Sequence, residues 1–147
     1  MRALIQRVSQ ARVSVNAKTV GEIRRGLLVF VGIREKDTEV QAAKLAKKIA
    51  NLRIFPDSDG KMNLSLRDVS GEMLVVSQFT LYGDTTSGNR PSYTEAAKPE
   101  TAKLLYEAFI QLCKEQDITV ATGVFQAHME VALINDGPVT LICHAEG

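Results

Sequence analysis

The chain has 147 residues, 45% of them apolar, which is enough for one domain with its own core and too short for two ordinary domains. Its 18 basic and 17 acidic residues give a formal charge of +1, which excludes a global field that would draw the chain onto nucleic acid or an anionic membrane. Any polyanionic partner must therefore be held by a local patch.

The cysteines and the apolar runs give no sign of export or of membrane insertion. Cys113 and Cys143 are the only cysteines, and neither has the spacing of a metal ligand or of a secreted disulfide framework. Arg2, Arg7 and Arg12 interrupt the apolar residues at the N-terminus, and a run of about 18 apolar residues occurs nowhere. We expect a soluble cytoplasmic protein without a membrane partner.

The first third of the chain has the patterns of three strands. Residues 2–15 and 19–23 are rich in β-branched residues, and Asn16-Ala17-Lys18 between them is typical of a turn, so we expect an opening hairpin. The nearly continuous apolar run of residues 27–33 predicts a strand that is buried on both faces.

A first helix is expected next. Asp37 or Thr38 can cap it, and helical spacing of apolar residues continues to about Leu52. Its inward side is expected to hold Val40, Ala43, Ala46, Ile49 and Ala50.

The middle of the chain returns to strands. The segment 57–60 is interpreted as a turn, because its resemblance to a calcium loop lacks a correctly placed glycine and a final acid. Residues 62–66 alternate as a strand does, and 73–82 form a longer apolar strand that ends in Ser77-Gln78-Phe79-Thr80.

A second helix and three further strands are expected in the remainder. Pro99 suits the first turn of a helix that extends to about Gln116. The inward positions of this helix are expected to be Leu104, Leu105, Ala108, Phe109 and Leu112. The three strands are expected at 118–125, 129–134 and 139–143.

These elements together predict an α+β fold in a single domain over residues 1–147. Strands dominate, so we expect a strongly curved, mostly antiparallel sheet or barrel on which two main helices pack.

Catalytic side chains of the familiar kinds are scarce. The only histidines are His128 and His144, and neither a G-x-S-x-G elbow nor an H-E-x-x-H motif is present. Ser77 and Thr80 have hydroxyls but no adjacent base, so neither is predicted to be a nucleophile. We expect no metal site and no cofactor.

The segment Asn135 to Thr140 contains Asp136-Gly137-Pro138 between two apolar runs. One interpretation is a hairpin turn, since Asp-Gly is a strong turn dipeptide. The other is a binding site built from backbone, because a Gly-Pro bond can be cis and glycine lets a ligand approach the main chain.

Several blocks of the sequence decide between these interpretations, because in this order they resemble the D-aminoacyl-tRNA deacylases, also called D-tyrosyl-tRNA deacylases. The similarity extends over nearly the whole chain. The blocks are Met1-Arg2-Ala3, Gln6-Arg7-Val8, Asn51-Leu52-Arg53-Ile54-Phe55, residues 60–66, Ser77-Gln78-Phe79-Thr80-Leu81-Tyr82, Arg90-Pro91-Ser92 and residues 135–140.

The resemblance implies a homodimer with active sites at the subunit interface. Gly137 and Pro138 of each subunit, joined by a cis bond, would enter the pocket of the partner, and Arg7 would brace them. Phe125 and Met129 would help to enclose the terminal adenine of tRNA. The facing catalytic wall would be Ser77, Gln78, Phe79 and Thr80.

The resemblance also implies the chemistry. The substrate would be the ester of D-aminoacyl-tRNA, and its hydrolysis would be a step of translation quality control. Backbone N–H groups near Phe79 and Thr80 would stabilise the oxyanion, with the terminal 2′-hydroxyl of tRNA assisting. L-isomers would be rejected by steric clash with Gly137-Pro138, and mischarged glycyl-tRNA(Ala) would be accepted because glycine has no Cβ. No DNA partner is expected.

Three alternatives remain open. The surface formed by Lys44, Lys47, Lys48 and Arg53 is a solvated face or a phosphate contact, and in the second case the chain could be an RNA-binding module without activity. The chain could also be a relative adapted to another chirality, with the Gly-Pro bond trans, or a purely structural dimer.

Two departures from the family pattern concern tRNA contacts: His128 replaces a common acid, and the loop 85–89 has no basic residue.

Overall fold

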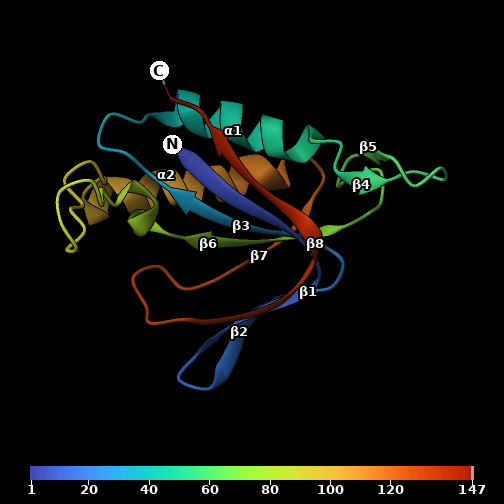
Figure 1. Ribbon diagram of the computed structural model, residues 1–147, viewed down its shortest axis with the longest axis horizontal. Helices are drawn as coiled ribbons and strands as arrows, with labels where there is room; N and C mark the ends of the chain where they lie inside the picture. Colours follow the sequence, from blue (N-terminus) through green and yellow to red (C-terminus); the bar gives the residue numbers. More distant parts are fainter. Residues whose placement is uncertain (147) are drawn as a thin grey trace.

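One long strand organises the sheet. The computed structural model describes residues 1–146, and in it β1 (Arg2–Val15) has neighbours along both edges. On one edge its first half pairs antiparallel with β3 (Gly26–Gly32) and its second half with β2 (Lys18–Ile23). On the other edge β8 (Glu130–His144) runs antiparallel along nearly the whole of β1 (Figure 1).

The sheet is mixed and nearly closes on itself. β6 (Glu72–Ser77) pairs parallel with β3, and β7 (Thr119–Thr122) pairs parallel with β6. The remaining pairs are antiparallel, as the α+β prediction expected. β2 and β7 approach at the open side, where a Cβ added to Gly21 would lie only 2.3 Å from the carbonyl oxygen of Thr122. Glycine is therefore required for this closure.

Two short strands form a small hairpin outside the main sheet. β4 (Phe55–Pro56) and β5 (Met62–Leu64) pair antiparallel around the turn that contains residues 57–60. That turn is confirmed: the carboxylate of Asp57 accepts hydrogen bonds from the backbone N–H groups of Asp59 and Lys61. Hydrogen bonds from these groups lower the pKa of Asp57, with the bond from Lys61 the largest cause.

Both main helices cover the same face of the sheet (Figure 1). α1 (Glu39–Asn51) begins after Thr38, whose hydroxyl accepts from Val40 N–H while Gln41 completes a capping box. α2 (Pro99–Lys114) begins with the expected proline. In residues 1–146 no helix is both long and apolar enough to cross a membrane.

The inward faces of the helices differ from the prediction at three positions. Val40 is 56% exposed, Leu104 is 70% exposed, and Ala43 is also exposed. The helices pack on each other and on the sheet through stripes that do not include these three residues. The buried stripes are Ala42, Leu45, Ala46, Ile49 and Ala50 in α1, and Ala102, Leu105, Tyr106, Phe109 and Cys113 in α2.

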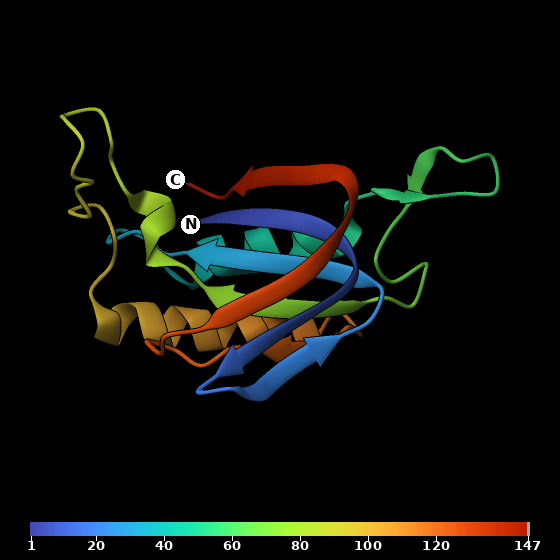
Figure 2. The ribbon, with the colours of Figure 1, turned by 60° about the horizontal axis from the view of Figure 1, so that its bottom comes forward.

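Strand boundaries differ as well. The expected strand 73–82 stops at Ser77, after which a 3-10 turn, η1 (Phe79–Tyr82), begins. The expected strand 118–125 is only the four residues of β7. The two strands expected at 129–134 and 139–143 are one interrupted strand, β8, which bends sharply as it follows β1 (Figure 2).

Candidate functional site

A pocket of about 670 Å³ lies between the end of β6, η1, the start of α2 and the loop before β8. It brings together five residues that the sequence singled out from two distant parts of the chain. They are Ser77, Gln78, Phe79, Phe125 and Met129.

The first wall of the pocket exists because β6 ends at Ser77 and the chain turns. Gln78 N–H still donates to Val31 O at 2.8 Å, and then η1 folds back over the end of β3. Gly32 makes room for this turn, because a Cβ there would lie 2.9 Å from the Cβ of Leu81. The Ser-Gln-Phe-Thr motif is therefore a strand end followed by a tight helical turn.

Phe79 and Thr80 are the first residues of that turn. Backbone N–H groups at the start of a helical turn have no carbonyl partner within the turn. The preceding residue, Gln78, makes no side-chain hydrogen bond to them; its amide nitrogen donates to the hydroxyl oxygen of Thr80 instead. Thr80 is not among the residues that line the pocket, and its hydroxyl is engaged by the Gln78 amide.

Aromatic rings support the apolar walls. Phe79 meets Tyr93 edge to face with 5.2 Å between ring centroids, and Tyr93 lines the pocket too. Phe125 meets Tyr106 of α2 in the same way at 5.9 Å, and the Tyr106 hydroxyl donates to Val75 O at 3.0 Å. Sequence reasoning missed both tyrosines. Their signal is weak, since each reads as an ordinary loop or core residue.

Met129 reaches the pocket past a glycine. A Cβ on Gly123 would lie 2.6 Å from the sulfur of Met129, so a larger residue at 123 would displace the thioether. The intervening loop includes Gln126 at φ 64°, a conformation that most side chains avoid. His128, which stands where an acid is common in the family that the sequence resembles, also lines the pocket.

The ionisable groups of the pocket are few. Of the lining residues that the structure describes, only Tyr93 and His128 have titratable side chains. Burial raises the pKa of Tyr106, behind Phe125, to about 12, so that phenol stays neutral. Within residues 1–146 no group of three or more histidine, cysteine or acidic side chains is placed to hold a metal ion.

Gly137 and Pro138 lie elsewhere, in the interruption of β8, and the bond between them is cis as expected. Asn135 is the partner of Val8 in β1, and Thr140 is the partner of Gln6. Residues 136–139 therefore stand opposite Arg7 alone and bulge out of the sheet.

Arg7 and Asn135 hold this bulge. Arg7 is only 9% exposed; its Nη1 donates to Ile54 O at 2.6 Å and its Nε to Asp136 O at 3.1 Å. The Asp136 carboxylate lies 3.1 Å from the same Nε. The Asn135 amide donates to Arg7 O and to Val139 O. Gly137 is thus fixed from both sides while remaining exposed.

The two motifs do not meet within one chain. Neither Gly137 nor Pro138 lines the pocket that contains Ser77 and Phe79. The strand that carries them, β8, pairs only with β1 in the part of the chain that the structure describes. Its exposed apolar residues are Ile134 at 53%, Leu141 at 37% and Ile142 at 63%.

Comparisons with known proteins are consistent from sequence to fold. A family profile described as "D-Tyr-tRNA(Tyr) deacylase" matches residues 4–144. A D-aminoacyl-tRNA deacylase from Thermotoga petrophila is 61% identical over 142 residues, covering 97% of this chain and 95% of the relative. One from Thermosipho africanus is 58% identical with the same coverage of both chains.

Two solved structures share the fold. One, titled "c-Myc DNA Unwinding Element Binding Protein", has a TM-score of 0.93 and 36% identity, with 100% of both chains covered. The other, a probable eukaryotic D-amino acid tRNA deacylase, has a TM-score of 0.82 and 17% identity, with 97% of both chains covered. The second likeness concerns the fold alone.

Proposed function

The chain belongs to the D-Tyr-tRNA(Tyr) deacylase family, and we propose that it is an ester hydrolase that cleaves D-aminoacyl-tRNA to free D-amino acid and tRNA. The observation that carries this proposal is the pocket that Ser77, Gln78 and Phe79 line together with Phe125 and Met129. Relatives that share 55–61% of their residues with this chain bear the name of that activity.

The active site is built by two copies of the chain. Gly137 and Pro138 are exposed at the free edge of β8, and they are not lining residues of their own chain's pocket. A 15-residue edge strand with exposed Ile134, Leu141 and Ile142 is the kind of surface that proteins cover. In a two-fold homodimer each β8 edge delivers its Gly-Pro bulge to the partner's pocket.

Chirality is read at the α-carbon. The carbonyl oxygens of Gly137 and Pro138 accept hydrogen bonds from the substrate's α-ammonium. The Cβ of a D-residue then points away from the bulge, whereas that of an L-residue collides with main chain that Arg7 and Asn135 hold in place. Because this scheme never reads the side chain, it accepts many D-amino acids.

Hydrolysis relies on backbone donors and on the substrate. The N–H groups of Phe79 and Thr80, at the open start of η1, stabilise the negative charge that develops on the ester carbonyl oxygen. Ser77 and Gln78 orient this turn. No lining residue in the described chain is a carboxylate, so the terminal 2′-hydroxyl of tRNA assists the attacking water.

The rest of the pocket receives the terminal adenosine and sets the substrate range. Phe125 and Met129 present an aromatic ring and a thioether, which suit the face of a base. Glycine has no Cβ to collide with the Gly-Pro bulge, so mischarged glycyl-tRNA(Ala) is a second substrate. The reaction belongs to translation quality control in the cytoplasm.

A binding module without activity is the main competing account. The solved structure at 36% identity is named for binding a DNA element, and four basic residues on and after α1 could contact a polyanion. The relatives at higher identity are named as deacylases, which favours the enzyme.

Co-expression of two differently tagged variants tests the two-chain site. Gly137→Ala damages the bulge, and Phe79→Pro removes an N–H from the pocket. In a heterodimer of these variants, one site contains both lesions and the other contains neither. Since half the dimers are mixed, about a quarter of wild-type cleavage of D-tyrosyl-tRNA should return. If each site lies within one chain, mixing restores nothing.

A further inference from the structure

A second, larger hollow lies on the outer side of α1. Its volume is about 940 Å³, and its other wall is the segment 144–146, which begins with the last residue of β8. Three lysines line it from one side of the helix, at positions i, i+3 and i+4, and one arginine follows the helix. These four exposed cations, which we call the basic groove, are Lys44, Lys47, Lys48 and Arg53.

The charge of the basic groove is not neutralised. Within residues 1–146 none of its four cations makes an ion pair. Glu146 is the only acid in the lining, and it is engaged by Arg2 at 3.2 Å and by the Tyr82 hydroxyl at 2.9 Å. Desolvation acts to raise the pKa of Glu146, but the hydrogen bonds from Tyr82 and Arg2 and the nearby arginine charges together hold that pKa below its ordinary value. In a chain of net charge +1, the groove is the local patch that a polyanion would require.

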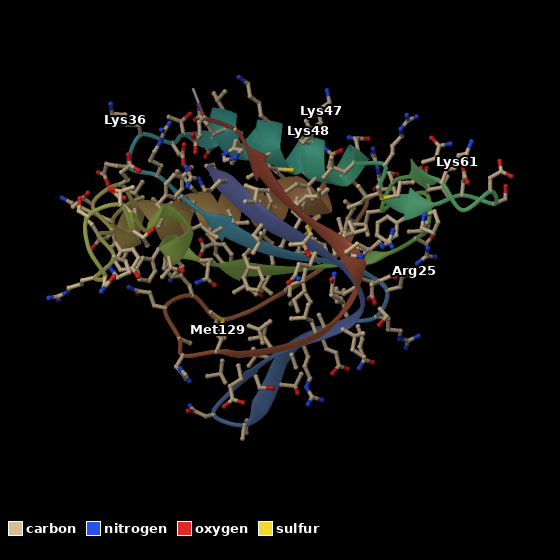
Figure 3. The ribbon with its side chains drawn as sticks, viewed as in Figure 1. Arg25, Lys36, Lys47, Lys48, Lys61 and Met129 are labelled. Atoms are coloured by element: carbon tan, nitrogen blue, oxygen red, sulfur yellow. The ribbon has the colours of Figure 1, made fainter. Side chains whose placement is uncertain are left out.

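The groove is remote from the pocket of its own chain. Figure 3 shows Lys47 and Lys48 on the opposite side of the molecule from Met129, which lines that pocket. The basic groove is, however, continuous with β8, the strand that carries the Gly-Pro bulge, because His144 at the end of β8 lines the groove. From Pro138 to His144 the chain stays in β8, a path of about 20 Å at the rise of a strand.

In the two-chain site, this path length can be compared with the length of the tRNA strand that leads away from the ester. The 3′ ester would lie beside Gly137-Pro138 of this chain and inside the partner's pocket. At about 3.4 Å per nucleotide along one strand, 20 Å corresponds to about six nucleotides. The backbone reaching the groove would then be that of the first base pairs of the acceptor stem.

We propose that the basic groove binds the phosphate backbone of the tRNA acceptor stem whose ester lies at the Gly-Pro bulge of the same chain. The inference rests on the proposed function and on its two-chain site. Lysines contact phosphates as mobile point charges, so the groove supplies affinity and orientation without reading sequence.

The test compares two triple variants that change charge equally. Lys44→Glu/Lys47→Glu/Lys48→Glu reverses the groove, and Lys18→Glu/Lys61→Glu/Lys103→Glu reverses three exposed lysines elsewhere. Each is assayed on D-tyrosyl-tRNA and on D-tyrosyl-adenosine, a short ester that cannot reach the groove. Thermal unfolding of both variants verifies that they fold.

The groove variant should lose about tenfold or more in kcat/KM on D-tyrosyl-tRNA, through KM, at low salt, and almost nothing on D-tyrosyl-adenosine. The control variant should lose no more than about twofold on either substrate. Equal losses by both variants on tRNA, or an equal loss by the groove variant on both substrates, would overturn the inference.

A binding measurement separates this inference from the proposed function. If the wild type cleaves neither ester, the proposed function fails, but the salt dependence of uncharged tRNA binding still tests the groove. The slope of log affinity against log salt should fall by about 2 to 3 in the groove variant and remain unchanged in the control. An unchanged slope in the groove variant, or equal wild-type affinity for a short DNA duplex, would contradict the assignment to tRNA.

Discussion

The Nε of Arg7 lies 3.1 Å from the carbonyl oxygen of Asp136, so a buried guanidinium in β1 holds the backbone directly before Gly137. The Nη1 of the same side chain donates to Ile54 O at 2.6 Å. One residue thereby ties the Gly-Pro bulge to the chain that follows α1, and the position of Gly137 depends on a side chain distant in sequence.

Arg7→Lys should weaken both stability and activity. A lysine cannot donate to Ile54 and Asp136 in the two directions that the guanidinium fork spans. We expect the free energy of unfolding to fall by about 2 kcal/mol and kcat/KM on D-tyrosyl-tRNA to fall at least about tenfold. Urea unfolding and initial rates measure the two effects. Arg12→Lys, at an exposed position of the same strand, is the matched control. Activity that survives Arg7→Lys within twofold would contradict the bracing role.

Gly137→Ala should abolish most deacylation while the fold survives. The new methyl would lie 2.6 Å from Asn135 Oδ1 and would occupy the space beside the substrate's α-carbon. Relief of that contact by a shift of about 1 Å in the bulge should cost about a hundredfold in kcat/KM on D-tyrosyl-tRNA.

Asn135→Ala distinguishes the two consequences of that methyl group. It removes the amide that donates to Arg7 O and Val139 O but adds nothing to the bulge. If the methyl acts on the substrate, Gly137→Ala is the more damaging variant. If Asn135→Ala is equally damaging, displacement of the amide explains both results.

Thr80→Ala should retain at least about a tenth of the wild-type kcat/KM, because the proposed donors are backbone N–H groups. The hydroxyl of Thr80 accepts from the Gln78 amide and does not line the pocket. Single-turnover rates on D-tyrosyl-tRNA measure the effect. Complete loss with unchanged thermal stability would favour a nucleophilic hydroxyl instead.

Phe79→Pro would remove the backbone N–H of residue 79, which is the first residue of η1. Proline is tolerated at that position, and Gln78 before it is non-helical, with φ −141°. Phe79→Pro and Phe79→Ala both lose the contact with Tyr93, so their ratio reports the N–H alone. We expect Phe79→Pro to be about a hundredfold slower than Phe79→Ala. Equal rates would remove this N–H from the mechanism.

The buried thiol of Cys113 should contribute to the pH dependence of the free energy of unfolding. Burial raises the pKa of Cys113 from 9.0 to about 12, so above pH 9 the unfolded chain loses a proton that the folded chain keeps. Stability from this group is complete below pH 9 and is lost as the pH rises toward 12, at up to about 1.4 kcal/mol per pH unit. Urea unfolding of Cys113→Ala between pH 8 and about 10.5 should show a shallower decline than the wild type. An identical slope would contradict the raised pKa.

Local patterns predicted the parts of this fold that depend on local chemistry. Thr38 caps α1, Pro99 opens α2, and the turn after β1 places Asn16 and Ala17 at φ 50° and 63°. The cis bond at Gly137 was expected from the family resemblance. Each feature is determined by residues next to it in the sequence or by a motif.

The predictions of strand boundaries and helix faces were wrong where residues distant in sequence determine the local structure. Residues 73–82 were predicted as one strand, but Gly32 makes the space into which Leu81 folds back. Residues 129–143 were divided into two strands, whereas Arg7 and Asn135 hold one interrupted strand together. Leu104 was placed inward because helical spacing does not reveal on which side the second helix packs.

The candidate site shows the same division. Ser77, Gln78, Phe79, Phe125 and Met129 were predicted, and the structure brings them into one pocket, whereas the predicted Thr80 does not line it. Tyr93 and Tyr106 were missed, because only the tertiary fold places their rings against Phe79 and Phe125. The roles of these residues in catalysis stay predictions.

The most direct test of the account is the cleavage of matched D-tyrosyl-tRNA and L-tyrosyl-tRNA by the purified protein, with a chelator present and Gly137→Ala as control. The account predicts rapid loss of the D-ester alone, and loss of that activity in the variant. Survival of both esters while tRNA still binds would contradict it and would make the chain an RNA-binding module.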